Sequence, residues 1–225
     1  MNKYQLKKFE KQTQYDLIKE KNKNNFLLIN ETACKSGQIV LAGDSITELY
    51  NLEFLHSLEE KCKLRIYNRG ISGDTSNRLY ERFEENVLNI KPRAVVLLIG
   101  INDLSRKSGW KYVASNIEKI INAIKDNDEN TLIILESVYP VNTLMNKGLR
   151  FKNIHNEIKC LNEEIFKLSE KYKTGFVDLS NVLSDSSGMF AETYTYDGLH
   201  PNASGYRVIS SHIEKALENL LEIEP

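Results

Sequence analysis

Residues 38–49 read QIVLAGDSITEL, and this stretch decides how the rest of the chain is interpreted. It begins with an apolar run that is typical of a buried strand. Gly43 and Asp44 break the run, and a helical pattern begins at Ser45. A strand that turns directly into a helix is typical of folds in which strands and helices alternate.

Ser45 itself has two possible roles, as a helix cap or as a nucleophile. Residues 45–48 read SITE and fit the S-x-x-E capping box, in which serine and glutamate satisfy each other's orphan backbone donors. Serines at helix starts are common and catalytic serines are rare, so this stretch alone favours the cap. A nucleophile would need partners from elsewhere in the chain.

Short apolar runs alternate with longer segments of helical period from residue 38 onward. Strands are predicted at residues 38–42, 64–67, 94–99, 131–136 and 175–177, and helices at about 47–61, 75–89, 111–127, 151–172 and 203–223. Strict alternation predicts a parallel sheet with helices on both faces, because crossover connections are right-handed. We therefore predict an α/β fold: a flavodoxin-like three-layer sandwich with a five-stranded parallel sheet of order 2-1-3-4-5.

The chain divides into two parts by composition. Residues 1–25 are rich in Lys, Gln, Asn and Glu, with apolar residues at roughly helical spacing. We expect residues 1–36 to form an N-terminal helical arm packed on the core, and residues 37–225 to form the main domain. An arm that binds a partner is the less favoured alternative, because charged runs are usually solvated faces.

Composition excludes several classes of function. The 225 residues carry 30 Lys and Arg against 31 Asp and Glu, so no overall field draws the protein to nucleic acid or anionic lipid. No stretch is long and apolar enough to span a bilayer, and no secretory signal is evident, so we expect a cytoplasmic protein with a small-molecule partner. The spacing of Cys34, Cys62 and Cys160 indicates neither a disulfide framework nor a zinc site.

Polar residues follow the predicted strands at the edge where parallel sheets bind ligands. They are Gly43-Asp44-Ser45 after the first strand, residues 68–74 (NRGISGD) after the second, residues 100–103 (GIND) after the third, and residues 197–201 (DGLHP) before the last helix. In open α/β sheets the carboxyl ends of the strands lie on one side, so these four clusters should meet there.

If the four clusters lie together, their side chains can carry out acyl transfer through a serine. His200 would take the proton of the Ser45 hydroxyl, and Asp197 would fix the imidazole tautomer and stabilise the imidazolium. An oxyanion needs preorganised donors, and three are available. They are the Ser45 N–H at a helix start, the Gly70 N–H and the Asn102 side chain.

Each residue also has a plain structural alternative. Gly70 can serve a turn, Asn102 can end a strand, and His200 can be an ordinary surface or core histidine. Carboxylates at strand ends could hold magnesium, with Asp44, Asp103, Asp197 and His200 as ligands, but this leaves no role for Ser45, Gly70 and Asn102. The metal site is the less favoured interpretation.

The four clusters resemble the blocks of the SGNH hydrolases, also called GDSL-type esterases and lipases. The match runs from residue 37 to about 222, in the expected order, with Ile46-Thr47 where leucine usually follows GDS. That variant is similar to the branch of platelet-activating-factor acetylhydrolase and lysophospholipase-like esterases. The resemblance implies Ser45 as nucleophile, His200 as base and Asp197 as its acid. It also implies Ser45, Gly70 and Asn102 as the oxyanion hole, with no metal or organic cofactor.

The expected reaction is hydrolysis of a carboxylic ester through an acyl-enzyme. The walls of the substrate site should come from loops at residues 104–110, 139–150 and 184–196. Their predicted lining residues are Leu104, Trp110, Tyr139, Met145, Met189, Phe190 and Tyr194. None of these loops carries a long apolar lid, which favours short acyl groups such as acetyl on a sugar. A lysophospholipase or thioesterase is one alternative, and a noncatalytic binding module on the same fold is another.

Overall fold

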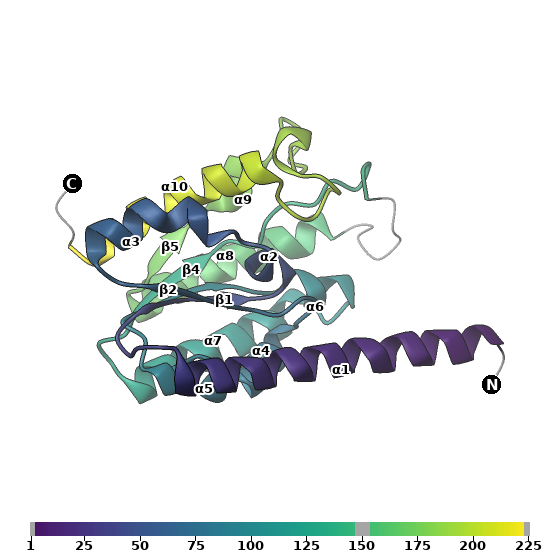
Figure 1. The fold of residues 1–225 in the computed structure, drawn as a ribbon. Coiled ribbons are helices and arrows are strands. Elements are labelled where there is room, and N and C mark those ends of the chain that lie inside the picture. Colours follow the sequence, from purple (N-terminus) through teal and green to yellow (C-terminus); the bar gives the residue numbers. More distant parts are fainter. Residues whose placement is uncertain (1–2, 147–153, 223–225) are drawn as a thin grey trace.

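A single parallel sheet forms the centre of the molecule (Figure 1), in a computed structural model that describes residues 3–146 and 154–222. The sheet has the order β2-β1-β3-β4-β5, and every pair of neighbours is parallel. Its strands are β1 (Ile39–Gly43), β2 (Ile66–Gly70), β3 (Ala94–Leu98), β4 (Leu132–Glu136) and β5 (Gly175–Val177). The predicted fold class and strand order are confirmed.

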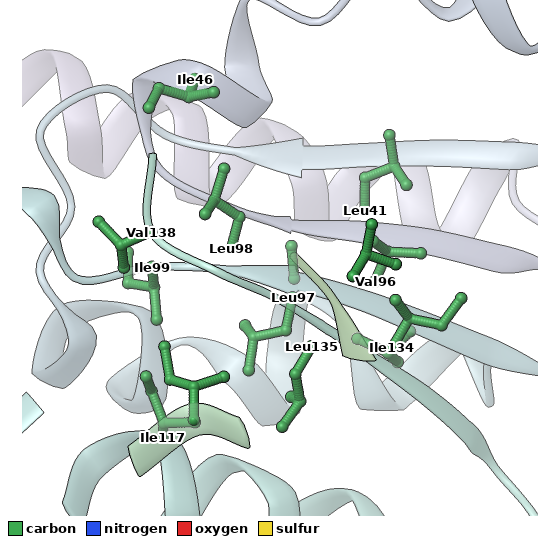
Figure 2. Close-up of a cluster of buried hydrophobic side chains, with 14 of the residues drawn as sticks. Leu41, Ile46, Val96, Leu97, Leu98, Ile99, Ile117, Ile134, Leu135 and Val138 are labelled. Atoms are coloured by element: carbon green, nitrogen blue, oxygen red, sulfur yellow. The ribbon is translucent and has the colours of Figure 1, made fainter. Parts of the chain in front are cut away.

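The two central strands are buried along their whole length. Every residue of β1 and of β3 is buried, which explains why both segments read as continuous apolar runs rather than alternating ones. Figure 2 shows Leu41 and Val96 close to Ile134 of β4, while Ile117 of a covering helix lies nearer to Ile99, the residue after β3. Helices therefore cover both faces of the sheet.

Amphipathic helices form the two outer layers. Helices α3 (His56–Cys62) and α10 (Ala203–Leu220) contact each other on one face, and α7 (Trp110–Asn127) and α8 (His155–Tyr172) contact each other on the opposite face (Figure 1). The predictions at residues 111–127 and 203–223 are confirmed to within a few residues. The prediction at 151–172 is confirmed from His155, while residues 151–153 lie outside the described part.

Two predicted helices are broken in the structure. The segment 47–61 contains α2 (Ser45–Glu48), a 3₁₀ turn η1 (Leu52–Leu55) and α3. The segment 75–89 contains α4 (Ser76–Glu81), α5 (Phe83–Asn86) and a 3₁₀ turn η2 (Leu88–Ile90). Continuous helices were therefore the wrong prediction.

Side chains explain both breaks. The Asn51 side chain accepts a hydrogen bond from the Glu53 N–H at 3.0 Å and starts η1. At Arg82 the backbone leaves helical geometry, and its buried guanidinium donates to the Gly43 and Arg69 carbonyls. A local side-chain cap thus interrupts the first predicted helix, and long-range hydrogen bonds of Arg82 accompany the break in the second. Three short elements were not predicted: α6 (Ile101–Ser105), α9 (Leu179–Leu183) and the 3₁₀ turn η4 (Glu192–Tyr194).

The N-terminal helix α1 (Lys3–Thr32) lies within the segment 1–36 expected to form a helical arm, and it runs beside α5 along one side of the molecule (Figure 1). Near its end, the Asn30 side chain accepts from the Arg69 guanidinium at 2.6 Å and donates to the Glu85 carbonyl at 3.1 Å. The boundary at residues 36 and 37 stays a prediction. Among the helices that the structure describes, none is both long enough and apolar enough to cross a membrane.

Candidate active site

Ser45 lies at the tight turn between β1 and α2. The turn needs glycine at position 43, because a Cβ there would lie 2.2 Å from Thr47 Oγ1 and 2.4 Å from the Leu98 carbonyl oxygen. Asp44 is the N-cap, and its carboxylate accepts the Ile46 N–H at 3.0 Å. Ser45 is therefore the first residue of α2, and its N–H is one of the helix's orphan donors.

The Ser45 hydroxyl is hydrogen-bonded to a histidine. Its Oγ lies 2.9 Å from His200 Nε2, and His200 Nδ1 lies 2.7 Å from Asp197 Oδ2. Burial pushes the pKa of the Asp197 carboxyl upward, but N–H groups of His200 and Leu199 and the His200 ring outweigh this, so its pKa lies below the usual value. An ionised Asp197 only accepts, which places the proton of neutral His200 on Nδ1 and leaves Nε2 to accept from Ser45.

The segment that carries this pair is a tightly bonded turn. Asp197 Oδ1 accepts the Leu199 N–H at 2.9 Å and the His200 N–H at 2.7 Å. Gly198 has φ +82°, and a Cβ there would lie 2.6 Å from the Asn142 carbonyl oxygen. The turn therefore fixes the carboxylate and the imidazole relative to each other.

Asn102 lies next to the residue that precedes the serine. Its Nδ2 donates to Asp44 Oδ2 at 3.1 Å and to the Asp74 carbonyl at 3.1 Å. The amide therefore joins the loop after β2 to the turn after β1. Both of its hydrogens have acceptors in this state, so donation to an oxyanion requires one of these long bonds to be shared or replaced.

Gly70 does not present its N–H to this site. The N–H donates to Asn68 Oδ1 at 2.9 Å, and Asn68 in turn donates to the Thr47 carbonyl at 2.6 Å. A Cβ on buried Gly70 would lie 2.2 Å from the Glu48 backbone nitrogen. Glycine is needed here because α2 packs directly on the end of β2. The assignment of Gly70 to the oxyanion hole is thus corrected to a packing role.

Gly73, three residues further on, has the properties that Gly70 lacks. It is only half-buried, has φ +70° and precedes Asp74, whose carbonyl accepts from Asn102. Within the described residues, its N–H has no recorded acceptor. The sequence signal was the second glycine of the NRGISGD segment, which was interpreted only as a turn residue.

Two carboxyls are buried beneath the site. Burial raises the pKa of Asp44 to about 7, partly offset by the Ile46 N–H. Burial also raises the pKa of Glu136, at the end of β4, to about 7, partly offset by the Tyr139 hydroxyl that donates to it at 2.6 Å. Asp44 and Glu136 repel each other when both are ionised. Glu136 and Tyr139 were not recognised as a pair from sequence, since no motif marks them.

The carboxylates of the alternative metal site have separate partners. Asp103 accepts from the Ser76 N–H at 2.9 Å and the Ser76 hydroxyl at 2.8 Å, whereas Asp44 faces Asn102 and Asp197 faces His200. Within residues 3–146 and 154–222, no group of three or more histidine, cysteine, aspartate or glutamate side chains is arranged to hold a metal ion.

The predicted lining residues separate into two groups. Leu104, Tyr139 and Phe190 are buried in the core, so their assignment to the substrate wall is wrong. Met145 is partly exposed, and its Cβ lies 3.1 Å from the position of a Cβ on Gly198, which places it beside the histidine turn. The others, Trp110, Met189 and Tyr194, are half-buried.

Tyr196 was missed by the sequence reasoning. Its ring stacks on the His200 imidazole, with centroids 5.9 Å apart and an interplanar angle of 14°, and the side chain is exposed. Stacking restricts rotation of the imidazole and supplies an aromatic surface next to His200. Its position directly before Asp197 was the available signal.

Comparison with known proteins places this geometry in a family. The GDSL-like lipase/acylhydrolase family model matches residues 41–208, so the chain belongs to that family. A solved structure from Streptococcus pneumonia, described only provisionally as a platelet activating factor, superposes with a TM-score of 0.83 at 27% identity. The match covers 98% of this chain and 100% of that one.

Curated relatives differ in how much of their length is matched. An arylesterase of Vibrio mimicus is 25% identical, over 85% of this chain and 94% of its own length. An acetylxylan esterase of Geobacillus stearothermophilus is 23% identical, over 72% of this chain and 75% of its own length. An N-acylneuraminate cytidylyltransferase of Escherichia coli O18:K1:H7 is 30% identical over 80% of this chain, which spans only 40% of that protein. Family membership and the two esterases make this chain an esterase-type hydrolase.

Proposed function

We propose that the protein hydrolyses carboxylic esters with Ser45 as nucleophile, His200 as general base and Asp197 as the acid that orients the imidazole. The observation that carries the proposal is the continuous chain of hydrogen bonds from the Ser45 hydroxyl through His200 to Asp197, at 2.9 and 2.7 Å. The roles follow from the proton positions. Nε2 accepts the serine proton while the hydroxyl oxygen attacks the ester carbonyl, and the imidazolium then protonates the leaving alcohol. Water next attacks the acyl-enzyme while Nε2 takes its proton, and return of that proton to Ser45 releases the carboxylic acid and restores the enzyme.

The oxyanion of the tetrahedral intermediate needs donors on the Ser45 side of the sheet. We propose the Ser45 N–H, the Asn102 side chain and, in place of Gly70, the Gly73 N–H. The Asn102 bonds to Asp44 and Asp74 support this set, because they join the segments that carry the other two donors. Bonds of 3.1 Å can be shared with a third atom, and catalytic hydrogen bonds commonly tighten only in the substrate complex.

We propose that the acyl group is short, such as acetyl on a sugar or another small alcohol. Two relatives support a sugar: one is described as acting on acetylxylan and another on an N-acylneuraminate. Exposed Tyr196 would offer a flat surface against which a sugar ring can stack. Hydrolysis of a lysophospholipid stays the alternative prediction. Thioester hydrolysis and a cytoplasmic location stay predictions.

The test combines active-site labelling with a substrate panel. We expect a fluorophosphonate probe to label Ser45 in the wild type and to leave Ser45→Ala unlabelled, with folding of both checked by circular dichroism. Acetyl, butyryl and octanoyl esters, acetylated sugars, a lysophospholipid and a thioester would then be compared by kcat/KM. Absence of labelling in folded wild-type protein would contradict the esterase mechanism, and a preference for octanoyl or lysophospholipid esters would contradict the short acyl group.

A further inference from the structure

Helix α1 reaches two of the segments that build the site. Lys19 Nζ lies 3.4 Å from Asp74 Oδ1, and the Asn22 amide donates to Glu48 Oε1 at 3.3 Å. The two side chains are three positions apart and therefore lie on the same side of the helix. One contact is made to the loop after β2, and the other to the last residue of α2.

Asp74 connects the first contact to the oxyanion region. Its carboxylate accepts from Arg82 Nε at 2.7 Å as well as from Lys19, and its carbonyl accepts from Asn102. Arg82 also donates to the Gly43 and Arg69 carbonyls at the ends of β1 and β2. Asp74 therefore links Lys19 and Arg82 to the Gly73 segment and to the Asn102 amide.

The Lys19 amine loses most of its hydration in order to reach Asp74. The residue is only 8% exposed, and burial lowers its pKa, with the Asp74 carboxylate acting in the opposite direction. A helix that needed only to cover a surface would bring an apolar side chain to this position, since Lys is seldom buried without a partner. The buried amine is thus tied to the position of the Asp74 carboxylate.

Glu48 connects the second contact to the nucleophile. It ends α2, the one-turn helix that Ser45 begins. Its Oε2 accepts from the Ser72 N–H at 2.7 Å and from the Ser72 hydroxyl, while its Oε1 accepts from Asn22. Glu48 therefore ties α2 to the residue before Gly73, and Asn22 holds Glu48 in that position.

We propose that α1 is a positioning element of the active site, in which Lys19 and Asn22 hold the Gly73–Asp74 segment and helix α2 in register with each other. The inference rests on the proposed ester hydrolysis and assigns a role in it to the N-terminal arm. Lys19 and Asn22 touch no reacting atom. They act through Asp74 and Glu48 on donors that bind the oxyanion, which exists only in the transition state and the intermediate.

The consequence is specific to one kinetic constant. Donors that are displaced by a few tenths of an ångström stabilise the transition state less, while binding of the neutral ester is hardly changed. Loss of the α1 contacts should therefore lower kcat and leave KM nearly constant. A helix that only stabilised the fold would change neither constant in the fraction of protein that remains folded.

The chain offers a matched control on the same helix. Lys23 is one turn after Lys19, and its amine pairs with Glu85 of α5 at 3.1 Å, away from the site. Lys19→Met keeps the length of the buried side chain and leaves Asp74 paired with Arg82, so it does not leave a lone buried charge. Lys23→Met removes a charge from the same helix without touching Asp74.

We expect Lys19→Met to lower kcat for an acetyl ester about tenfold with KM within about twofold of wild type, Lys19→Arg to restore most of the loss, and Lys23→Met to have no effect. Asn22→Ala should lower kcat about threefold, and it provides the test if Lys19→Met does not fold. The proposal is overturned if folded Lys19→Met or Asn22→Ala retains the wild-type kcat, or if Lys23→Met loses as much as Lys19→Met.

A second readout does not depend on catalysis. Amide hydrogen exchange of residues 70–76 should be faster in Lys19→Met and Asn22→Ala than in wild type, and unchanged in Lys23→Met. If the wild type neither hydrolyses esters nor reacts with a fluorophosphonate, the proposed function fails while this comparison still tests the positioning role. Equal exchange in all four proteins would overturn the positioning role.

Discussion

The Ser45 hydroxyl lies 2.9 Å from His200 Nε2, although 155 positions separate the two residues in the chain. The hydroxyl is thus bonded to the imidazole and does not cap α2. Asp44 provides the cap, and Glu48 bonds to Ser72 and Asn22 instead of completing a capping box. The capping-box interpretation of Ser45 was wrong, because the Asp44 side chain caps α2. The Ser45 hydroxyl can therefore bond to His200.

Asp197→Asn should lower kcat on the order of 10⁴-fold with little change in fold, because an amide can donate to Nδ1 and hold the wrong imidazole tautomer. Hydrolysis of an acetyl ester at pH 7 to 8 measures the effect. Asp178→Asn, at an exposed helix cap, is the control. A loss of less than tenfold would contradict the role of Asp197 in orienting the imidazole.

The same substitution should change stability in acid. The folded pKa of Asp197 is depressed, so the carboxylate adds stability above its unfolded value of 3.8, and that stability is lost as pH falls through the lower folded pKa. The asparagine side chain does not titrate, so the free energy of unfolding of the variant should fall less steeply as the pH is lowered. Urea unfolding between pH 2 and 6 would show this, and parallel curves would count against the depressed pKa.

Asn102→Ala should lower kcat about a hundred- to a thousandfold with a small effect on KM, because one oxyanion donor contributes about 3–4 kcal/mol in the transition state. Asn77→Ala, at a half-buried position of α4, removes an amide that donates to Glu81 Oε1 at 2.7 Å, and should leave kcat unchanged. Fluorophosphonate labelling of the Asn102 variant checks that Ser45 and His200 stay in place. An Asn102 variant of normal kcat would remove this side chain from the oxyanion hole.

Gly70→Ala should destabilise the protein, because a Cβ 2.2 Å from the Glu48 backbone nitrogen forces α2 away from β2. We expect the variant to have a lower thermal midpoint of unfolding and a lower activity, since α2 carries Ser45. Gly175→Ala should lower the thermal midpoint less, because a Cβ on Gly175 would lie 3.1 Å from the flexible Ile134 side chain. Full stability of Gly70→Ala would contradict the packing role.

Glu136→Gln should change how stability depends on pH. Burial raises the folded pKa of Glu136 from 4.5 to about 7, so ionisation opposes folding, and the wild type loses stability as pH rises from about 4.5 to 7. That interval of about 2.5 pKa units corresponds to roughly 3 kcal/mol. The variant should lose less over this range in urea unfolding. Identical slopes for the two proteins would show that Glu136 does not titrate there.

Several features were predictable because they depend on local pattern. The continuous apolar runs at β1 and β3 identify buried parallel strands, and alternation with helices orders the sheet. The polar clusters after the strands placed Ser45, Asn102, Asp197 and His200 on one edge, and the structure brings Ser45, His200 and Asp197 within hydrogen-bonding distance and links Asn102 to the neighbouring Asp44.

Other features required the packed structure. Periodicity predicted one helix at 75–89, but the buried Arg82 guanidinium bonds to carbonyls of β1 and β2 and breaks it. Tyr139 and Phe190 were expected in loops that line the site, yet both are core residues. A residue's burial depends on neighbours that are distant in sequence, and local pattern does not contain them.

The sequence by itself determined the strands and their order, because these follow from hydrophobic periodicity and from the alternation of strands with helices. It also supplied the side chains to which we assign acyl-transfer roles, because serine, histidine and aspartate together fit that chemistry. Only the tertiary structure decided which backbone N–H is available to an oxyanion. Gly70 and Gly73 look alike in sequence, but the Asn68 side chain occupies the N–H of Gly70 and helix α2 packs against its Cα. Whether a donor is free depends on the acceptors around it, which are set by packing.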